Sequence, residues 1–382
     1  MKQRFYSLDV FRGATVALMI LVNNPGSWNH IYAPLEHAPW HGCTPTDLVF
    51  PFFLFAVGNA LAFVMPRVQE EGSGKFWKKV LKRSASIFLI GLFLNWLPFV
   101  YYDPGGQLVF KTWSHVRILG VLQRIALCYF FASVIIYYFR ERGAFLAGLI
   151  LLLIYWALCI AFGELNDPFS LNGWFGTRID KAILGENHMY HGEGVAFDPE
   201  GIMSTLPAIV QVIFGYMVGN YIIKKGKSYE MVSNLFLAGS VLVFTGYCWD
   251  MIFPINKKIW TSSYVVYTTG LAIIILAVLI HIIEFWNRRG WWSKFFDVFG
   301  KNPLFIFALS AVVVKTYLLF RIKDVNSEGK VVYNNLAGWM YDHIFLPAFG
   351  AMNGSLFYAI FHIIIFWLLA RLLDKKKIYI KV

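Results

Sequence analysis

Ten apolar segments, each about as long as a membrane-spanning helix, dominate this sequence. Hydrophobic residues make up 58% of the 382 residues and charged residues 15%, against roughly 25% charged in a soluble domain. About 20 apolar residues in a helix cross a hydrocarbon core of ~30 Å. We therefore predict an all-α polytopic membrane bundle of about ten transmembrane helices, at residues 8–24, 45–66, 84–101, 117–139, 144–163, 201–223, 232–252, 264–286, 302–320 and 355–373.

The basic residues predict the orientation of these spans. With a cytoplasmic N-terminus, 22 of the 34 Lys and Arg residues fall in inner segments and eight in outer segments. Because cytoplasmic loops are enriched in Lys and Arg, both termini are predicted to be cytoplasmic. The net charge of +12 then reflects short clusters beside an anionic leaflet, so we expect the lipid bilayer as a partner and no nucleic acid.

Three long polar connections, at about 25–44, 164–200 and 321–354, fall on the outer side in this orientation. They are too long to be plain turns, and seven of the nine histidines lie on the same side. The chain has no linker, low-complexity tract or clear internal repeat. We therefore treat residues 1–382 as a single transmembrane domain and expect its chemistry at the outer face.

The end of the first outer connection holds a histidine close to a predicted helix start. Thr44, Pro45 and Asp47 fit an N-cap, a proline in the first turn and an acid at the third position. Capping alone explains Asp47, and it also places the preceding residues at the mouth of the second span. A histidine held there, such as His37, is a candidate general base because its reference pKa is about 6.5.

Charged and amide side chains inside apolar spans need a partner, a water-filled cavity or a ligand. Asp9 and Arg12 are three residues apart, so they either pair with each other or contact a cytoplasmic ligand. Arg117 and Arg124 share one face of the fourth predicted span, with Gln123 beside the second. This group fits either a substrate-binding or anion-binding site or a buried structural ion pair.

Acids and a lysine at two further helix starts have the same double interpretation. Asp198 and Glu200 flank Pro199 at the start of the sixth span, where capping explains them and binding an amino group is a second role. Residues 300–303 (GKNP) have the composition of a helix start that contacts phosphate, with an ordinary loop as the alternative.

Two histidine pairs have spacings that metal ligands use. His37 and His41 are four residues apart, and His188 and His191 are three apart. Neither pair has a third ligand at a characteristic spacing, so we expect no metal.

Seven motifs in this order resemble one known family. They are residues 7–13 (SLDVFRG), 37–42 (HAPWHG), 47–51 (DLVFP), 120–124 (GVLQR), 198–201 (DPEG), 256–264 (NKKIWTSSY) and 300–303 (GKNP). Together they resemble the heparan-α-glucosaminide N-acetyltransferase family of transmembrane acyltransferases, including its bacterial members. The resemblance covers nearly the whole chain, but not the N-terminal luminal region of the lysosomal enzymes.

The resemblance implies an acetyl transfer across a membrane. Cytoplasmic acetyl-CoA would be the co-substrate and a glucosamine-type amine on the far, periplasmic side the acceptor. It implies a multi-pass protein of the bacterial inner membrane and a homodimer. The family's active-site histidine, in its His-Ala-x-Trp motif, corresponds to His37, and the tryptophan of the motif, Trp40, is expected to bind substrate. The resemblance does not decide whether the histidine is itself acetylated or only deprotonates the amine.

The remaining candidate residues are expected at the two ends of the path that the acetyl group follows across the membrane. An acyl transfer needs a base, oxyanion donors and exclusion of water. Asn23 or Asn24 is expected to donate to the oxyanion, and Asp47 or Asp198 to orient the imidazole of His37. The nucleotide phosphates of acetyl-CoA are expected near a cytoplasmic group: Asp9, Arg12, Lys78, Lys79, Lys82, Lys301 and Asn302.

An amino-sugar transporter of the inner membrane is the alternative function. Bacterial relatives with these motifs have been proposed as permeases for N-acetylglucosamine-type sugars. A helical bundle with a polar interior around Arg124 suits either class. A transporter needs a site open to each face in turn, whereas the enzyme needs a thioester path that ends at one histidine.

Overall fold

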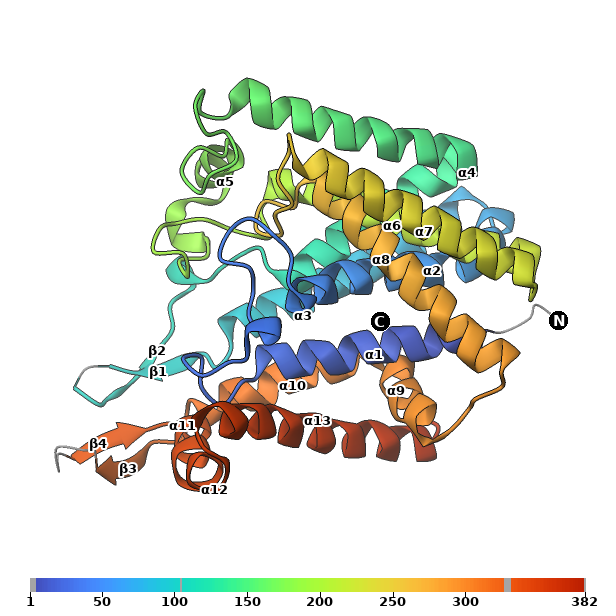
Figure 1. The fold of residues 1–382 in the computed structure, drawn as a ribbon. Coiled ribbons are helices and arrows are strands. Elements are labelled where there is room, and N and C mark those ends of the chain that lie inside the picture. The colour runs from blue at the N-terminus through green and yellow to red at the C-terminus, as the bar shows by residue number, and fades with distance from the viewer. Residues whose placement is uncertain (1–4, 104, 326–330, 381–382) are drawn as a thin grey trace.

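Long helices, most of them running roughly side by side, make up the fold of the computed structural model (Figure 1). It describes residues 5–103, 105–325 and 331–380, so part of the predicted outer connection, residues 326–330, lies outside the described residues. The long helices are α1 (Tyr6–Asn23), α2 (Val49–Glu70), α3 (Ser73–Trp96), α4 (Val121–Phe162), α6 (Ile202–Lys225), α7 (Tyr229–Asp250), α8 (Ser262–Ile280), α9 (Trp291–Lys301), α10 (Pro303–Tyr317) and α13 (Ala351–Lys375).

Short elements occupy the long connections. A 3₁₀ turn (Pro45–Leu48) leads into α2, and α5 (Gly176–Leu184), α11 (Leu336–Met340) and α12 (Leu346–Phe349) lie in the other two loops. Two antiparallel hairpins, β1 (Val100–Tyr102) with β2 (Leu108–Phe110) and β3 (Ile322–Val325) with β4 (Val331–Asn334), extend from the same end of the bundle (Figure 1). The fold is thus almost entirely helical, as predicted, with two small hairpins that were not predicted.

The described part of the chain contains seven helices long and apolar enough to cross a membrane, or eight if the bent pair α9 and α10 forms one span. The membrane character is confirmed, and the count of ten stays a prediction. Two predicted spans, 117–139 and 144–163, correspond to the two helices of α4, which meet at a break at Arg140, where φ is 56° and ψ is −162°. The predicted span 84–101 is wrong in its bounds: residues 84–96 are the second half of α3, and residues 100–101 belong to β1. The first turns of α3 carry five Lys and Arg residues, which lower its hydropathy.

The two ends of the chain lie at the same end of the bundle. Tyr6 at the start of α1 and Tyr379 line one cavity, and the backbone of Ile378 and Ile380 is bonded to Asn302 between α9 and α10. The 18 residues of α1 rise by ~27 Å toward the opposite end, where the connection to α2 begins. We call these the terminal end and the loop end.

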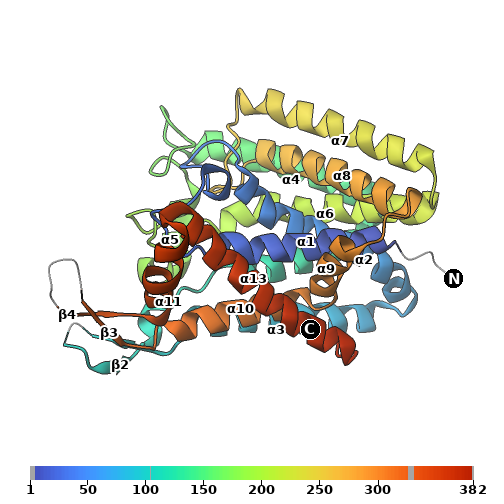
Figure 2. The same ribbon diagram turned by 60° about the horizontal axis from the view of Figure 1, so that its bottom comes forward.

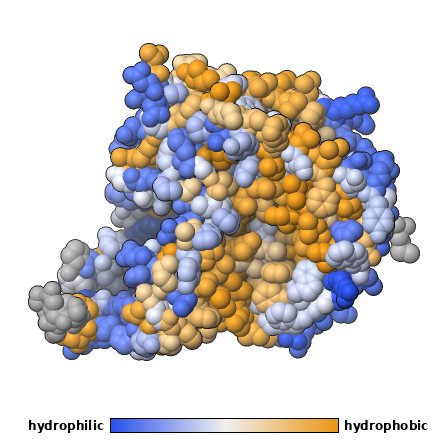
Figure 3. Space-filling view, viewed as in Figure 1, coloured by the Kyte–Doolittle hydropathy of each residue, from blue (hydrophilic) through white to orange (hydrophobic). Residues whose placement is uncertain are grey.

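The surface carries the pattern expected of a membrane protein. Hydrophobic residues cover the middle of the face seen in Figure 3, and hydrophilic residues gather toward the two ends. Many large apolar side chains on α4 and α7 are exposed, among them Leu153, Leu237 and Phe244. In a bilayer these positions face lipid, so their exposure is consistent with insertion of the helices.

Helix α1 lies inside the bundle, in contact with α2, α8, α9, α10 and α13 (Figure 2). Its approach to α9 depends on two glycines. A Cβ on Gly13 would lie 1.8 Å from the Phe296 carbonyl oxygen, and a Cβ on Gly300 would lie 2.3 Å from the Asp9 carbonyl oxygen. Gly300, part of the candidate phosphate motif, is therefore explained by backbone packing.

Replacing Gly13 with alanine should lower the free energy of unfolding in detergent by about 1–3 kcal/mol, the usual cost of overpacking. The matched control is Gly74→Ala on α3, where an added Cβ meets nothing within 4 Å and helix propensity favours alanine by ~1 kcal/mol. Equal unfolding midpoints for the two variants would show that α1 and α9 separate without cost.

Candidate active site

The histidine singled out by the sequence is bonded to the carboxylate at the start of the second span. His37 Nδ1 lies 2.6 Å from Asp47 Oδ1 at the loop end. The His37 side chain is 43% exposed and that of Asp47 is 1% exposed. With Nδ1 donating to the carboxylate, Nε2 carries the lone pair. The pair therefore joins a partly exposed imidazole to a buried carboxylate.

Asp47 performs both of the roles that the sequence left open, one with each oxygen. Oδ2 accepts the backbone N–H of Thr44 at 3.0 Å and that of Ala38 at 3.0 Å, which confirms the predicted capping box. Oδ1 is left for His37. Tyr264 of α8 donates to the Asp47 carbonyl at 2.5 Å, so His37 is bonded to a helix start that is itself held in place.

A lysine from a distant loop completes this cluster. Lys257 Nζ lies 3.2 Å from both ring nitrogens of His37 and 3.9 Å from Asp47 Oδ1. Burial lowers the pKa of Lys257, against the opposing effect of Asp47 and Glu200. Lys257 was not among the residues predicted to act at the site. The feature of the sequence that could have indicated a role for Lys257 is its position in the motif of residues 256–264.

Asn23 and Asn24, the predicted oxyanion donors, differ in their surroundings. Asn24 is buried, and its side-chain N–H donates to the Ile20 carbonyl at 2.7 Å. Asn23 is exposed at the last turn of α1. The described contacts bring neither amide to His37, so an oxyanion role for either residue stays a prediction.

Trp40 lies beside the cluster in a fixed position. Its indole N–H donates to the Phe169 carbonyl at 2.8 Å, and its ring packs 5.6 Å from that of Phe197. Lys258 Nζ lies 5.7 Å from the Trp40 ring centroid and forms a 2.7 Å ion pair with Glu193. An aromatic face flanked by both charges suits a saccharide, which is consistent with the predicted substrate contact.

The two acids near the sixth span belong to a buried ion pair. Arg117 donates to Asp198 Oδ1 at 2.6 Å and to Glu200 Oε2 at 2.5 Å, while its guanidinium lies 4.9 Å from the Tyr190 ring. Burial alone would lower the pKa of Arg117, but Glu200 and Asp198 raise it above its usual value. Of the two acids expected to orient His37, Asp47 is bonded to it, whereas Asp198 is bonded to Arg117.

Capping of α6 by Asp198 was predicted, and that detail is wrong. α6 begins at Ile202, whose N–H is accepted by Asp180 of α5 at 2.9 Å. Burial raises the pKa of Asp180 to about 7. Arg117 also lies before the helical part of its predicted span, because α4 begins at Val121.

Arg124 is fully buried below this network. It donates to Ser204 and to the Gly201 carbonyl, and its guanidinium lies 5.0 Å from the Trp260 ring. Among the described residues, its Nε and Nη1 have no hydrogen-bond partner, and neither has Nε2 of the neighbouring Gln123. The pair therefore retains donors for water or a ligand, as expected of a polar interior.

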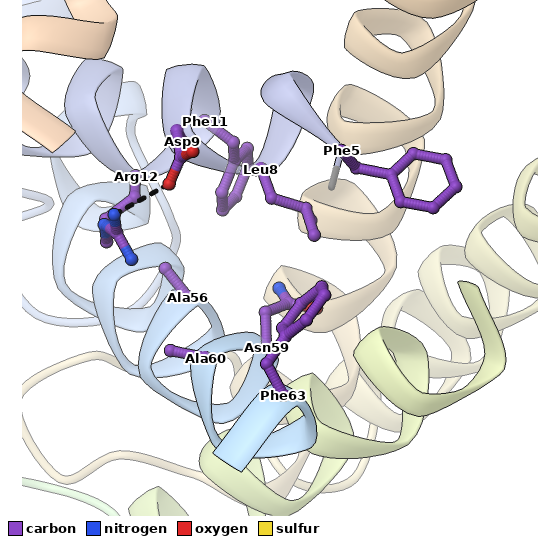
Figure 4. A pocket seen from close by; sticks show the side chains of 9 residues that line it. All are labelled: Phe5, Leu8, Asp9, Phe11, Arg12, Ala56, Asn59, Ala60 and Phe63. Atoms are coloured by element: carbon purple, nitrogen blue, oxygen red, sulfur yellow. Dashed lines mark hydrogen bonds and ion pairs between the residues drawn. The ribbon is translucent and has the colours of Figure 1, made fainter. Parts of the chain in front are cut away.

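At the terminal end, Arg12 lies between two adjoining cavities. The first, of about 330 Å³, is mainly apolar and runs between α1 and α2 (Figure 4). Both side-chain polar atoms of Asn59, which lines it, are buried without a partner among the described residues. The second, of about 560 Å³, is lined by Tyr6, Asp9, Arg12, Arg289, Asp297, Lys301 and Tyr379.

The predicted cytoplasmic group is only partly gathered there. Asp9 and Arg12 form the expected ion pair at 2.8 Å, and Lys301 joins them in the second cavity while bonded to Asp297 and Asp374. Asn302 instead holds the segment at Ile378 and Ile380. Lys79 pairs with Glu71, and Lys78 and Lys82 are exposed on α3. None of the three α3 lysines lines either cavity, whereas Arg289, which was not predicted, does.

No group of three potential metal ligands occurs in the part of the chain that the structure describes. His188 and His191, one of the two pairs considered, each bond a backbone carbonyl, those of Val116 and Met189.

Comparison with known proteins identifies the family. Residues 4–248 match the family described as heparan-alpha-glucosaminide N-acetyltransferase, catalytic. The chain belongs to this family. The match contains the His37–Asp47 pair and the Arg117 network, and it confirms the resemblance inferred from the seven motifs.

Two curated relatives carry the same name. The heparan-alpha-glucosaminide N-acetyltransferase of Mus musculus is 27% identical over 376 residues, which cover 84% of this chain and 55% of the mouse protein. The Homo sapiens enzyme is 26% identical over 391 residues, covering 87% of this chain and 57% of the human protein. The chain thus spans about half the length of these relatives.

Proposed function

We propose that this protein is a transmembrane N-acetyltransferase that moves an acetyl group from cytoplasmic acetyl-CoA to the amine of a glucosamine-type sugar on the outer side. The observation that carries the proposal is the His37–Asp47 pair, with Nδ1 and Oδ1 2.6 Å apart, at the loop end of a bundle whose terminal end holds a cationic cavity. Family membership supports the reaction type.

The pair supplies the proton chemistry of an acetyl transfer. Only the neutral glucosamine amine is a nucleophile, and its nitrogen must lose a further proton as it attacks the thioester carbonyl, so the transfer needs a base. Nε2 of His37 is the exposed base, and Asp47 fixes the tautomer that leaves it unprotonated. Trp40 and the Lys258–Glu193 pair are the nearby groups suited to hold the sugar.

The two cavities at the terminal end fit the parts of acetyl-CoA. Three cations, Arg12, Arg289 and Lys301, face two carboxylates around the larger cavity, and cations of this kind bind phosphates. The smaller cavity is apolar except for Asp9, Arg12 and the unpartnered amide of Asn59. A pantetheine arm, apolar with two amide groups, matches this lining.

The charge distribution supports the sidedness. With the terminal end in the cytoplasm, 22 Lys and Arg residues lie in inner segments and eight in outer ones, in accordance with the positive-inside rule. His37 then faces the periplasm of a bacterial inner membrane. The acetyl group therefore has to cross most of the bilayer inside the bundle.

An amino-sugar transporter is the second candidate, favoured by the unpartnered donors of the buried Arg124. Assays on a single protein preparation can distinguish the two functions. Purified protein in detergent should transfer radiolabelled acetyl from acetyl-CoA to glucosamine, and proteoliposomes without acetyl-CoA should not accumulate labelled glucosamine or N-acetylglucosamine. Uptake without acetyl transfer would reverse the assignment.

Arg12→Met should raise the KM for acetyl-CoA about tenfold, because it removes a charge-assisted bond to phosphate. The KM for S-acetylpantetheine, which lacks the nucleotide, should change less than twofold in the same variant. The matched controls are Lys78→Met and Lys82→Met, which remove one positive charge each at the same end but outside the cavity. An equal rise of KM in all three variants would show that the positive charge of this surface as a whole, and not a specific phosphate site, attracts acetyl-CoA.

A further inference from the structure

Lys257 lies on a rigid loop between α7 and α8. The fully buried Asn256 accepts the N–H of Ile259 at 3.0 Å through its side chain, and its own backbone N–H donates to Thr261 Oγ1 at 3.0 Å. Thr261 also caps α8 by accepting the N–H of Tyr264. The position of Lys257, the residue next to Asn256, is therefore fixed relative to the start of α8.

This loop is joined to the loop that carries His37. The N–H of Gly42 donates to the Ile255 carbonyl at 2.7 Å, and Gly42 and Asn256 form an isolated β-bridge. Lys258 donates to the Pro39 carbonyl at 2.7 Å. Because two backbone contacts and a side chain connect the loops, Lys257 and His37 occupy fixed positions relative to each other.

The ammonium of Lys257 lies against the imidazole of His37. Its Nζ is 3.2 Å from Nε2 and equally far from Nδ1. Its carboxylate neighbours are Asp47 and Glu200, and its cationic neighbours are Lys258 and Arg124. Asp47 is already bonded to His37, Thr44 and Ala38, so the Lys257 ammonium retains N–H groups for a substrate.

Acetyl transfer produces a negative charge beside Nε2. When the amine nitrogen attacks, the thioester carbonyl oxygen becomes an oxyanion, and donors aimed at it supply much of the catalysis. The amide of Asn24, a predicted oxyanion donor, is bonded to the Ile20 carbonyl, and the described contacts do not bring it to His37. A cation about 3 Å from the base is within reach of an oxygen bonded to the reacting carbon.

We propose that Lys257 is the catalytic residue that stabilises the oxyanion of the acetyl group at His37. The proposal rests on the proposed acetyltransferase function. In the step, the C–N bond forms as the amine proton passes to Nε2 of His37, and the C–S bond breaks as the oxyanion collapses. The proton moves from Nε2 to the departing thiolate, giving N-acetyl sugar and free CoA thiol, while Lys257 keeps its own proton throughout.

Lys257→Met tests this assignment in purified full-length protein. With glucosamine and acetyl-CoA, we expect kcat to fall by about 10²–10³-fold, as for loss of one oxyanion donor, while both KM values change less than threefold. Lys257→Arg should recover part of kcat because it restores the positive charge. The matched control is Lys181→Met, which removes an exposed lysine of α5 paired with Glu186 and should leave kcat unchanged.

His37→Ala, measured in parallel, distinguishes this proposal from the proposed function. An inactive His37→Ala with a Lys257→Met kcat within threefold of the wild type would refute the role of Lys257 alone. Full activity of His37→Ala would instead refute the assignment of the base. A rise in KM with an unchanged kcat would make Lys257 a substrate-binding residue instead. If Lys257→Met does not fold, Lys257→Gln, which keeps a neutral donor, carries the same comparison.

Discussion

His37→Ala should reduce acetyl transfer to glucosamine by about 10²–10⁴-fold, the usual contribution of a general base. The substitution removes Nε2, the exposed nitrogen that accepts the amine proton. Initial rates with radiolabelled acetyl-CoA in detergent measure the effect. At more alkaline pH the deficit should narrow, because solvent base can then take more of the proton that the attacking amine loses.

This variant should fold, so its activity is interpretable. Asp47 loses the bond from Oδ1 to His37, but Oδ2 keeps the N–H groups of Thr44 and Ala38 that cap the start of α2. The matched control is His30→Ala in the same loop, whose ring contacts Ser27 at 3.3 Å. A His37→Ala rate within threefold of that of His30→Ala would exclude His37 as the base.

The His37–Asp47 pair was predictable because both residues belong to one local pattern. A cap followed by proline and an acid fixes a helix start, and a histidine ten residues earlier is carried to it by a short loop. Lys257 was not predictable from such patterns. It lies 220 residues from His37 in sequence, and only the packing of two separate loops brings it there.

At the terminal end, the residues of one motif have different roles. Residues 300–303 were predicted to hold phosphate or to form an ordinary loop. In the structure Gly300 permits the close approach of α1, Lys301 lines the cationic cavity and Asn302 holds the C-terminal segment. Composition at a helix start shows which chemistry is possible, but the neighbouring helices decide which residue performs it.

The hydropathy pattern predicted the bundle better than it predicted its elements. Helix α3 carries lysines through its first half, so its apolar part is too short to be separated from a loop by composition. Hydropathy also placed Arg117 inside a predicted span, although it lies before the start of α4. It lies in an apolar window, yet its acidic partners are 81 and 83 residues away, and their attraction holds it outside α4.

The Arg117 network makes the second large prediction, which concerns stability. Arg117→Met should lower the free energy of unfolding by about 3–5 kcal/mol, because it removes the cation that is hydrogen-bonded to two buried carboxylates. The side chains of Asp198 and Glu200 are 0% and 11% exposed, so water does not replace the guanidinium. Thermal or denaturant unfolding in detergent at pH 7 measures the loss.

The pH dependence identifies the cause of that loss. In the wild type, burial raises the pKa of Glu200 but Arg117 outweighs it, so the pKa lies below its usual value. Without Arg117, we expect burial to outweigh the remaining cations, Arg124 and Lys257, so that the folded-state pKa of Glu200 rises above the unfolded value. The folded variant then binds more protons than the unfolded chain, so its stability should increase as the pH falls from 7 toward 5. The pKa of Asp198, already raised by burial, should rise further and act in the same direction.

A triple variant supplies the matched control. Arg117→Met combined with Asp198→Asn and Glu200→Gln removes the stranded charges and keeps the shape of both side chains, so most of the lost stability should return. Its unfolding should also lose the recovery on acidification. If the single variant is as stable as the wild type at pH 7, or if neutral amides restore nothing, the two acids are solvated in the native protein. They would then be available to bind a substrate amine, as the sequence alone allowed.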